Sequence, residues 1–97
     1  MLTVTAPNLP GHKLDTWYLE AFCRTGSTQR DWRQTTIPHK TELLSEDKEG
    51  QRLQLKTRVE PNVEVVHDIR ALGDEVEFLL TLKNTGPEFL DVDWFQP

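Results

Sequence analysis

"RLQLKTRVEPNVEVVHDIRALGDEVEFLLTLKN" (residues 52–84) contains three runs in which apolar and polar side chains alternate. A period of two is that of a β-strand with one buried and one solvated face. Two turn-forming pairs, Pro61–Asn62 and Gly73–Asp74, separate the runs. Because strands joined by such short links pair antiparallel, this stretch predicts a meander of three strands.

The alternation also assigns a face to each side chain. The predicted inward set is Leu53, Leu55, Thr57, Val59, Val63, Val65, His67, Ile69, Val76, Phe78, Leu80 and Leu82. His67 carries an imidazole within this apolar set. We therefore expect a hydrogen-bonded histidine in the core at this position.

Further strands are predicted on both sides of the meander. They fall in residues 2–5, 16–24, 41–45 and 89–96. Residues 6–15 are rich in proline and glycine and indicate a connector, and residues 24–36 indicate a long loop. With about seven strands and no helix, the chain is predicted to be all-β, an antiparallel β-sandwich or a curved half-sandwich.

The 97 residues indicate a single domain, residues 1–97. The last predicted strand looks core-forming and lies at the end of the sequence. We therefore expect that the natural chain continues, making this one a fragment of a longer sheet, or that residues 89–95 pair with a second copy in a homo-oligomer.

Composition excludes several classes of protein. The net charge of −5 argues against a nucleic-acid module, which usually presents a basic face. No apolar run approaches the roughly 18 residues of a membrane helix. Cys23 is the single cysteine, so no internal disulfide forms. Together with the lack of a signal-peptide pattern, it favours the cytoplasm. No phosphate-loop, dinucleotide or zinc-finger motif occurs, so neither a cofactor nor a metal is expected.

The first candidate site is in the long loop, where Trp32 lies between Arg30 and Arg33. An indole ring stacks on a sugar or a base, and guanidinium groups hydrogen-bond hydroxyls or carboxylates in bidentate fashion. The alternative is that Trp32 folds back and anchors the loop to the sheet. Both readings give the tryptophan a role, because so large a side chain rarely stays fully hydrated.

The second candidate is one face of the predicted strand 16–24, which carries Tyr18, Glu20, Phe22 and Arg24. Aromatic rings that alternate with charged groups suit a carbohydrate-binding sheet surface. The alternative is a second buried face, since the opposite side of the strand is also apolar.

Ionisable groups supply weaker candidates. His39 and Lys40 follow the long loop, where a histidine beside a lysine suits acid/base work. Asp91 and Asp93 share one face, at a spacing compatible with a calcium pair or with simple solvation. His12, His39 and His67 show no metal-ligand spacing.

Two resemblances complete the sequence evidence. "VEFLLTLKNTG" resembles a strand and turn of bacterial immunoglobulin-like modules. "WYLEAFCRTGSTQRDWRQTTIPHKTELL", "VEVVHDIRALGDEVEFLLTLKNTG" and "DVDWFQP" are similar to the N-terminal part of uncharacterised bacterial proteins of the planctomycete kind, which loosely resemble galactose-mutarotase-like sandwiches. The second resemblance implies a link to carbohydrates, and no catalytic residue of a mutarotase is matched.

These observations predict a non-catalytic module that binds a carbohydrate or a protein partner through residues 24–40 and the adjoining sheet face. The expected site residues are Tyr18, Glu20, Arg30, Trp32, Arg33 and His39. One alternative is part of a carbohydrate-active enzyme that uses Glu20, His39 or His67 as acid or base. Another is a purely structural domain that dimerises.

Overall fold

The computed structural model describes residues 1–18, 21–26, 31–92 and 94–96, and it confirms the all-β class. Every strand pair is antiparallel. The strands are β1 (Leu2–Thr5), β2 (Lys13–Thr16), β3 (Ala21–Cys23), β4 (His39–Glu46), β5 (Arg52–Val59), β6 (Val63–Leu72), β7 (Glu75–Asn84) and β8 (Trp94–Gln96). Two short helical turns, η1 (Pro10–His12) and α1 (Trp32–Thr35), interrupt them. No helix in these ranges is long and apolar enough to cross a membrane.

The predicted meander is confirmed as the larger part of a four-stranded sheet with the order β4-β5-β6-β7. Consecutive strands are neighbours, so each connection is a short hairpin turn. Gly73 adopts a φ of 50° in the turn between β6 and β7, a backbone conformation that glycine adopts without steric cost. The β6–β7 register then runs without a shift from Leu72↔Glu75 to Val63↔Asn84.

The inner face of this sheet carries the predicted inward set. Thr57, Val65 and His67, in the central strands, are fully buried. The edge strands are covered less well, because Phe78 and Leu82 of β7 keep 41% and 55% of their surface exposed. The alternation therefore predicted the direction of each side chain, but not how far the second layer reaches.

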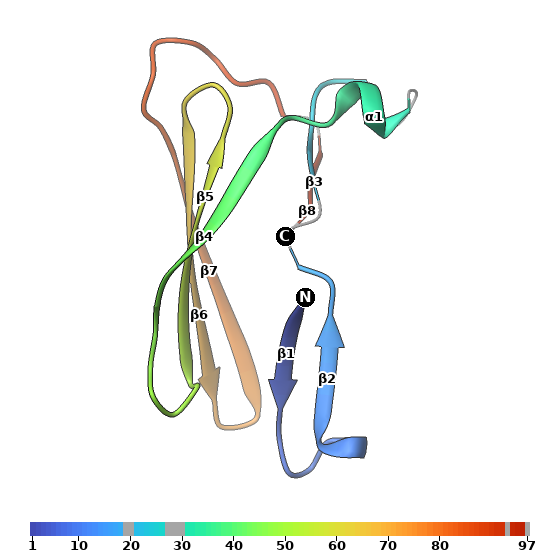
Figure 1. Cartoon of the computed structure of the whole chain (residues 1–97), viewed down its shortest axis with the longest axis vertical. Helices are drawn as coiled ribbons and strands as arrows, with labels where there is room; N and C mark the ends of the chain where they lie inside the picture. The colour runs from blue at the N-terminus through green and yellow to red at the C-terminus, as the bar shows by residue number, and fades with distance from the viewer. Residues whose placement is uncertain (19–20, 27–30, 93, 97) are drawn as a thin grey trace.

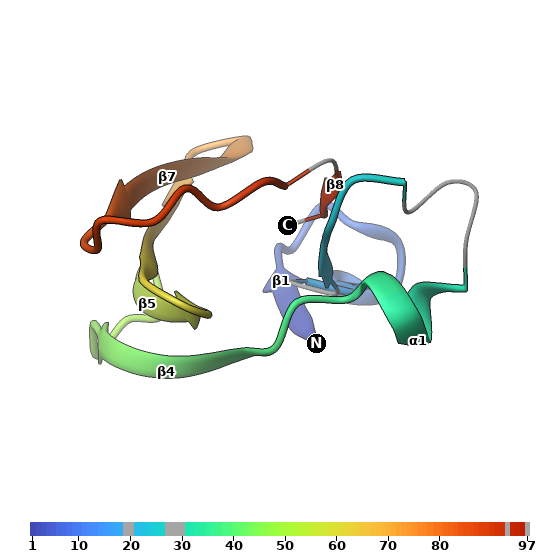
Figure 2. The same cartoon turned by 90° about the horizontal axis from the view of Figure 1, so that it is seen from above.

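The second layer consists of two separate two-stranded sheets rather than one continuous sheet. Figure 1 shows the β1–β2 hairpin and the β3–β8 pair one above the other, along the same side of the four-stranded sheet. Seen from above, the two layers separate clearly (Figure 2). Phe22, Ile37, Val59 and Val65 form the core between the layers.

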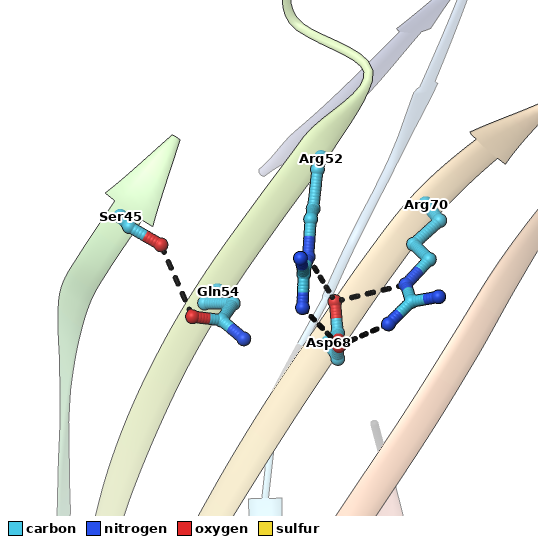
Figure 3. A network of polar contacts seen from close by, with 5 residues as sticks. All are labelled: Ser45, Arg52, Gln54, Asp68 and Arg70. Carbon is cyan, nitrogen blue, oxygen red and sulfur yellow. Dashed lines mark hydrogen bonds and ion pairs between the residues drawn. The ribbon is translucent and has the colours of Figure 1, made fainter. Parts of the chain in front are cut away.

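The outer face is held by ion pairs. Arg52 donates from Nε to Oδ1 of Asp68 (3.1 Å) and from Nη2 to Oδ2 (2.9 Å), and Nη2 of Arg70 donates to the same Oδ2 (3.0 Å; Figure 3). Ser45 donates to Oε1 of Gln54 beside them (3.1 Å). Hydrogen bonds from Arg52 and Arg70 lower the pKa of Asp68 to about 2, so the carboxylate stays charged.

Residues 6–15 are not only a connector, as expected, because Lys13–Thr16 is strand β2. It pairs with β1 from Leu2↔Thr16 to Thr5↔Lys13. Thr3 donates to Asp15 (2.7 Å), and Lys13 forms an ion pair with the same carboxylate (2.9 Å). Proline and glycine are confined to the turn of this hairpin, where they interrupted the alternation on which the prediction depended.

Two further predicted strands are shorter than expected. Among the described residues 17–18 and 21–24, strand β3 covers Ala21–Cys23, and Trp17 is 71% exposed. Glu20 lies outside the described residues. Among the described residues 89–92 and 94–96, β8 (Trp94–Gln96) is the one strand, and it pairs with β3 of the same chain. Each short strand finds its partner far along the sequence, which local alternation cannot reveal.

The long loop of residues 24–36 is tied to the sheet by its backbone. The Arg24 amide donates to the Thr35 carbonyl (2.8 Å), and the Ile37 amide donates to the Phe22 carbonyl (2.7 Å). The single turn α1 lies between them, and Oδ1 of Asp31 accepts from the Arg33 amide at its start (3.0 Å). The loop thus has its own short helix, contrary to expectation.

Candidate binding site

One end of the four-stranded sheet collects most of the polar groups that could meet a ligand. We call it the turn end, and it comprises the β5–β6 turn (residues 60–62), the start of β4 and residues 85–91. The Glu60 amide donates to the Pro38 carbonyl (3.1 Å), and the Thr85 amide donates to the Asn62 carbonyl (2.8 Å). These bonds hold two segments, distant from each other in sequence, against one turn.

Gly86 is required for this close approach. A Cβ atom added at Gly86 would collide with the Asn62 side chain. The Asn62 carbonyl also accepts from Oγ1 of Thr85 (2.8 Å), so turn and connector are joined twice. The turn end is therefore a fixed structure rather than a loose loop.

A first hollow of about 410 Å³, the His39 hollow, opens on one side of the turn. Its charged lining is Lys40, Arg58, Glu60 and Glu64, together with the ring of His39. The His39 ring lies edge-on to Phe22, with the ring centres 5.2 Å apart, and its Nδ1 is 3.3 Å from the Ile37 carbonyl. When Nδ1 donates to that carbonyl, Nε2 remains to accept a hydrogen bond from a ligand.

A second hollow of about 450 Å³, the Phe89 hollow, also has Glu60 and Pro61 in its wall. Arg24, Phe89 and Asp91 line it as well. Phe89 is 100% exposed. The lining combines this hydrated phenyl ring with one guanidinium and three carboxylates, those of Glu60, Glu88 and Asp91, and so offers one flat apolar surface and several hydrogen-bonding groups.

Two contacts fix the polar lining of the Phe89 hollow. Oγ1 of Thr25 donates to Oδ2 of Asp91 (2.6 Å), and Nη1 of Arg24 donates to the Thr36 carbonyl (3.2 Å). Each contact uses only part of the hydrogen-bonding capacity of the charged group. The carboxylate and the guanidinium are thus oriented and still able to bind a hydroxyl group. Asp93, the expected companion of Asp91, lies outside the described residues.

The structure places the expected site residues in different regions. His39 lines the hollow that bears its name, whereas Arg33 is exposed on α1 and lines neither hollow. Glu20 and Arg30 lie outside the described residues, as does the side chain of Trp32. Sequence reasoning missed Phe89, although the predicted alternation of residues 89–96 places it on the same outward face as Asp91.

Tyr18 belongs to a polar chain on the inner face and not to the turn end. Its hydroxyl lies 2.9 Å from Nδ1 of His67, and Nε2 of His67 lies 3.0 Å from Oγ1 of Thr57. Thr57 in turn bonds Thr41 (2.8 Å). Burial lowers the pKa of His67 and raises that of Tyr18, so both are neutral near pH 7. The prediction of a hydrogen-bonded core histidine is confirmed.

The donor sets do not suggest a metal centre. Among the residues that the structure describes, no group of three histidine, cysteine, aspartate or glutamate side chains is arranged to hold an ion. Cys23 is buried in β3. The linings of the two hollows offer hydrogen-bonding groups and apolar surface.

Comparison with protein-family models, with curated proteins and with solved structures gave no match. The resemblance to planctomycete and mutarotase-like proteins stays a prediction from the sequence. The geometry of the turn end carries the functional argument.

Proposed function

We propose that this chain is a non-catalytic module that binds a carbohydrate at the turn end of the four-stranded sheet. The ligand occupies the Phe89 hollow and extends across the β5–β6 turn to the His39 hollow. This surface includes the beginning and the end of the segment 24–40. It agrees with the carbohydrate link that the sequence resemblance implies.

The exposed ring of Phe89 is the observation that carries the proposal. Leaving an aromatic side chain wholly in water forgoes about 2 kcal/mol of burial energy. Phe89 lines a hollow of about 450 Å³, a volume within the range of small-molecule sites. A sugar ring offers an apolar face to stack on a phenyl group and hydroxyls at its rim, which matches this combination.

The charged lining supplies the other half of recognition. Arg24 donates hydrogen bonds, whereas Glu60 and Asp91 accept them. Sugar hydroxyls both donate and accept hydrogen bonds, so an uncharged sugar can bond to the donor and the acceptor side chains of the lining. On the far side of the turn, His39 adds a further acceptor.

The position of His67 supports a binding role over catalysis. An acid/base mechanism needs at least two ionisable groups that meet the substrate. His67 has both ring nitrogens in hydrogen bonds within the core and lines neither hollow. His67, one of the three residues considered as a catalytic acid or base, therefore has a structural role in the core.

A glycan array followed by titration calorimetry tests the proposal. We expect the chain to bind at least one neutral glycan, and we expect Phe89→Ala to weaken that binding about tenfold, the effect of removing one aromatic contact. Trp17→Ala is the matched control, because Trp17 is an exposed aromatic residue that lines neither hollow. His39→Gln tests the first hollow in the same way.

Two results would overturn the proposal. One is an array without any bound glycan at millimolar ligand. The other is a Phe89→Ala variant that binds as tightly as the unmodified chain. Because Phe89 is wholly exposed, its replacement leaves the fold intact, so lost binding reports on the site.

A further inference from the structure

We propose that two copies of this chain associate through the free edge of β7, which pairs antiparallel with itself around Leu79. The two four-stranded sheets then form one continuous eight-stranded sheet. The inference concerns a different surface from the turn end, and it does not depend on the proposed carbohydrate site.

The edge of β7 is open. In the described part of the chain β6 is its sole strand partner, and β7 ends the order β4-β5-β6-β7. The connector that follows β7 turns away from it, because the Thr85 amide donates to the Asn62 carbonyl in the β5–β6 turn. An edge strand of ten residues with an unbroken register presents a row of backbone groups ready to pair.

The opposite edge of the sheet lacks these properties. The β4–β5 register shifts between Leu43 and Ser45. Both edges carry three charged residues, Lys40, Glu42 and Glu46 on β4 and Glu75, Glu77 and Lys83 on β7, so the register shift is the difference between them. A bulge is one of the features by which natural sheets prevent edge-to-edge pairing. The four residues Phe78–Leu80 and Leu82 instead make the centre of β7 apolar.

The sequence of β7 is complementary to its own reverse. When Leu79 faces Leu79 of a second copy, Glu75 faces Lys83, Val76 faces Leu82 and Phe78 faces Leu80. Directly opposed residues of an antiparallel pair share a face. The Val76–Leu82 and Phe78–Leu80 pairs therefore meet on the inner side, and the Glu75–Lys83 pairs and the central Leu79 pair meet on the outer side. Two Glu75–Lys83 pairs form by symmetry.

Neighbouring registers match less well. A shift by one residue would place the inner face of one sheet beside the outer face of the other. A register centred on Leu80 still pairs Lys83 with Glu77, but it sets Val76 against Asn84 and Glu75 beyond the end of the strand. The Leu79-centred register pairs residues 75–83 throughout, with Glu77 opposite Thr81 and every other pair either apolar or of opposite charge.

The apolar exposure of β7 also points to a partner. Leu79 is 56% exposed on the outer face, and Phe78 and Leu82 are open on the inner face. Pairing brings Leu79 beside its symmetry mate, Phe78 beside Leu80 of the second copy, and Leu82 beside Val76 of the second copy. The second copy therefore shields the flanks of these apolar side chains from water.

Sedimentation velocity tests the proposal on the full chain, over about 1 µM to 1 mM, the range of weak and transient interfaces. We expect the mass to rise from 11.3 kDa towards a dimer. Leu79→Lys sets two like charges face to face and is expected to raise the dimer dissociation constant about tenfold or more. Leu44→Lys is the matched control on β4, where the leucine is 48% exposed, and it should leave the dimer unchanged.

Charge reversal tests the register itself. Lys83→Glu should weaken the dimer, since it opposes Glu75, and the double variant Glu75→Lys, Lys83→Glu should restore it. In the Leu80-centred register the double variant would not be restored, because Glu77 would still face the new carboxylate. Both positions are exposed, so these variants remain informative if Leu79→Lys fails to fold.

Three outcomes would overturn the inference. They are a monomer throughout the concentration range, a dimer that Leu79→Lys leaves intact, and a double variant that is not restored. A dimer that persists in Leu79→Lys would show that the two copies associate through another surface, for example residues 89–95. None of these results alters glycan binding at the turn end, so the two proposals fail separately.

Discussion

His67 and Asp68 are neighbours on β6, yet they point to opposite faces of the four-stranded sheet and show how differently those faces are held. His67 is fully buried on the inner face, and burial lowers its pKa because the charged imidazolium is disfavoured there. Asp68 lies on the outer face, and Arg52 and Arg70 lower its pKa because they favour the charged carboxylate. Both pKa values are therefore lowered, that of His67 because its charged form is disfavoured and that of Asp68 because its charged form is favoured.

The difference teaches where the stability of the sheet resides. The inner face removes apolar side chains from water and satisfies its few polar groups with neutral hydroxyls. The outer face gains ion pairs with partly exposed arginines and the hydrogen bond between Ser45 and Gln54, and surface contacts of this kind typically contribute little. Breaking each face in turn should therefore give unequal effects.

The largest effect is expected from Phe22→Ala. Phe22 is buried at the centre of the core with Ile37, Val59 and Val65, and truncation of such a phenyl ring costs about 3–5 kcal/mol. Chemical denaturation should show a large decrease in the free energy of unfolding. Phe89→Ala is the matched control, and it should cost less than about 0.5 kcal/mol because that ring is fully exposed. A similar decrease in the free energy of unfolding for both variants would contradict the idea that the buried inner face holds most of the stability.

The interior of the meander could be predicted from sequence, because one face of each strand must be apolar and the strands are adjacent along the chain. That reasoning correctly placed His67, a polar residue, in the core. In the second layer, the strand predicted at residues 2–5 is confirmed as β1, but the pairing of β3 with β8 escaped prediction. Strands β3 and β8 have three residues each, and about 70 residues separate them in sequence, too few and too distant for a local pattern.

The candidate site was predicted only in part, because local sequence patterns locate its loops but not the contacts between them. His39 follows a long loop, and loops at the end of a sheet are where ligand groups collect. Phe89 was missed because the strand predicted at residues 89–96 was assigned a buried face that carries Leu90 and Val92. The opposite face, which carries Phe89, was expected to be solvated. The turn contacts of Asn62 and Thr85, which build the hollows, depend on tertiary structure alone.

An intermediate effect is expected from acidifying the inner face. The folded pKa of His67 lies below the unfolded value of about 6.5, so the unfolded chain binds the proton more readily. The stability that His67 contributes is complete above that pH and is lost as the pH falls below it. Denaturation midpoints measured from pH 8 to pH 5 should decline, and the decline should diminish in His67→Gln.

The exposed histidine His12 supplies the control for this titration. It lies in η1, at the β1–β2 hairpin, outside the core. His12→Gln should keep the pH dependence of the unmodified chain. A His67→Gln variant with an unchanged decline would show that another group is responsible.

The smallest effect is expected from Asp68→Asn on the outer face. The pKa of Asp68 falls from 3.8 to about 2 on folding, so its contribution is present above pH 4 and is lost as the pH falls towards 2. Asp68→Asn should therefore lower the melting temperature slightly at pH 6 and low salt, and the difference from the unmodified chain should vanish near pH 2. Added salt should reduce it as well, because the side chains of Arg52 and Arg70 are 49% and 44% exposed to solvent. Asp74→Asn, the same exchange in the β6–β7 turn, should lack this dependence on pH and salt. If Asp68→Asn lowered the free energy of unfolding as much as Phe22→Ala does, the outer face would contribute as much stability as the core.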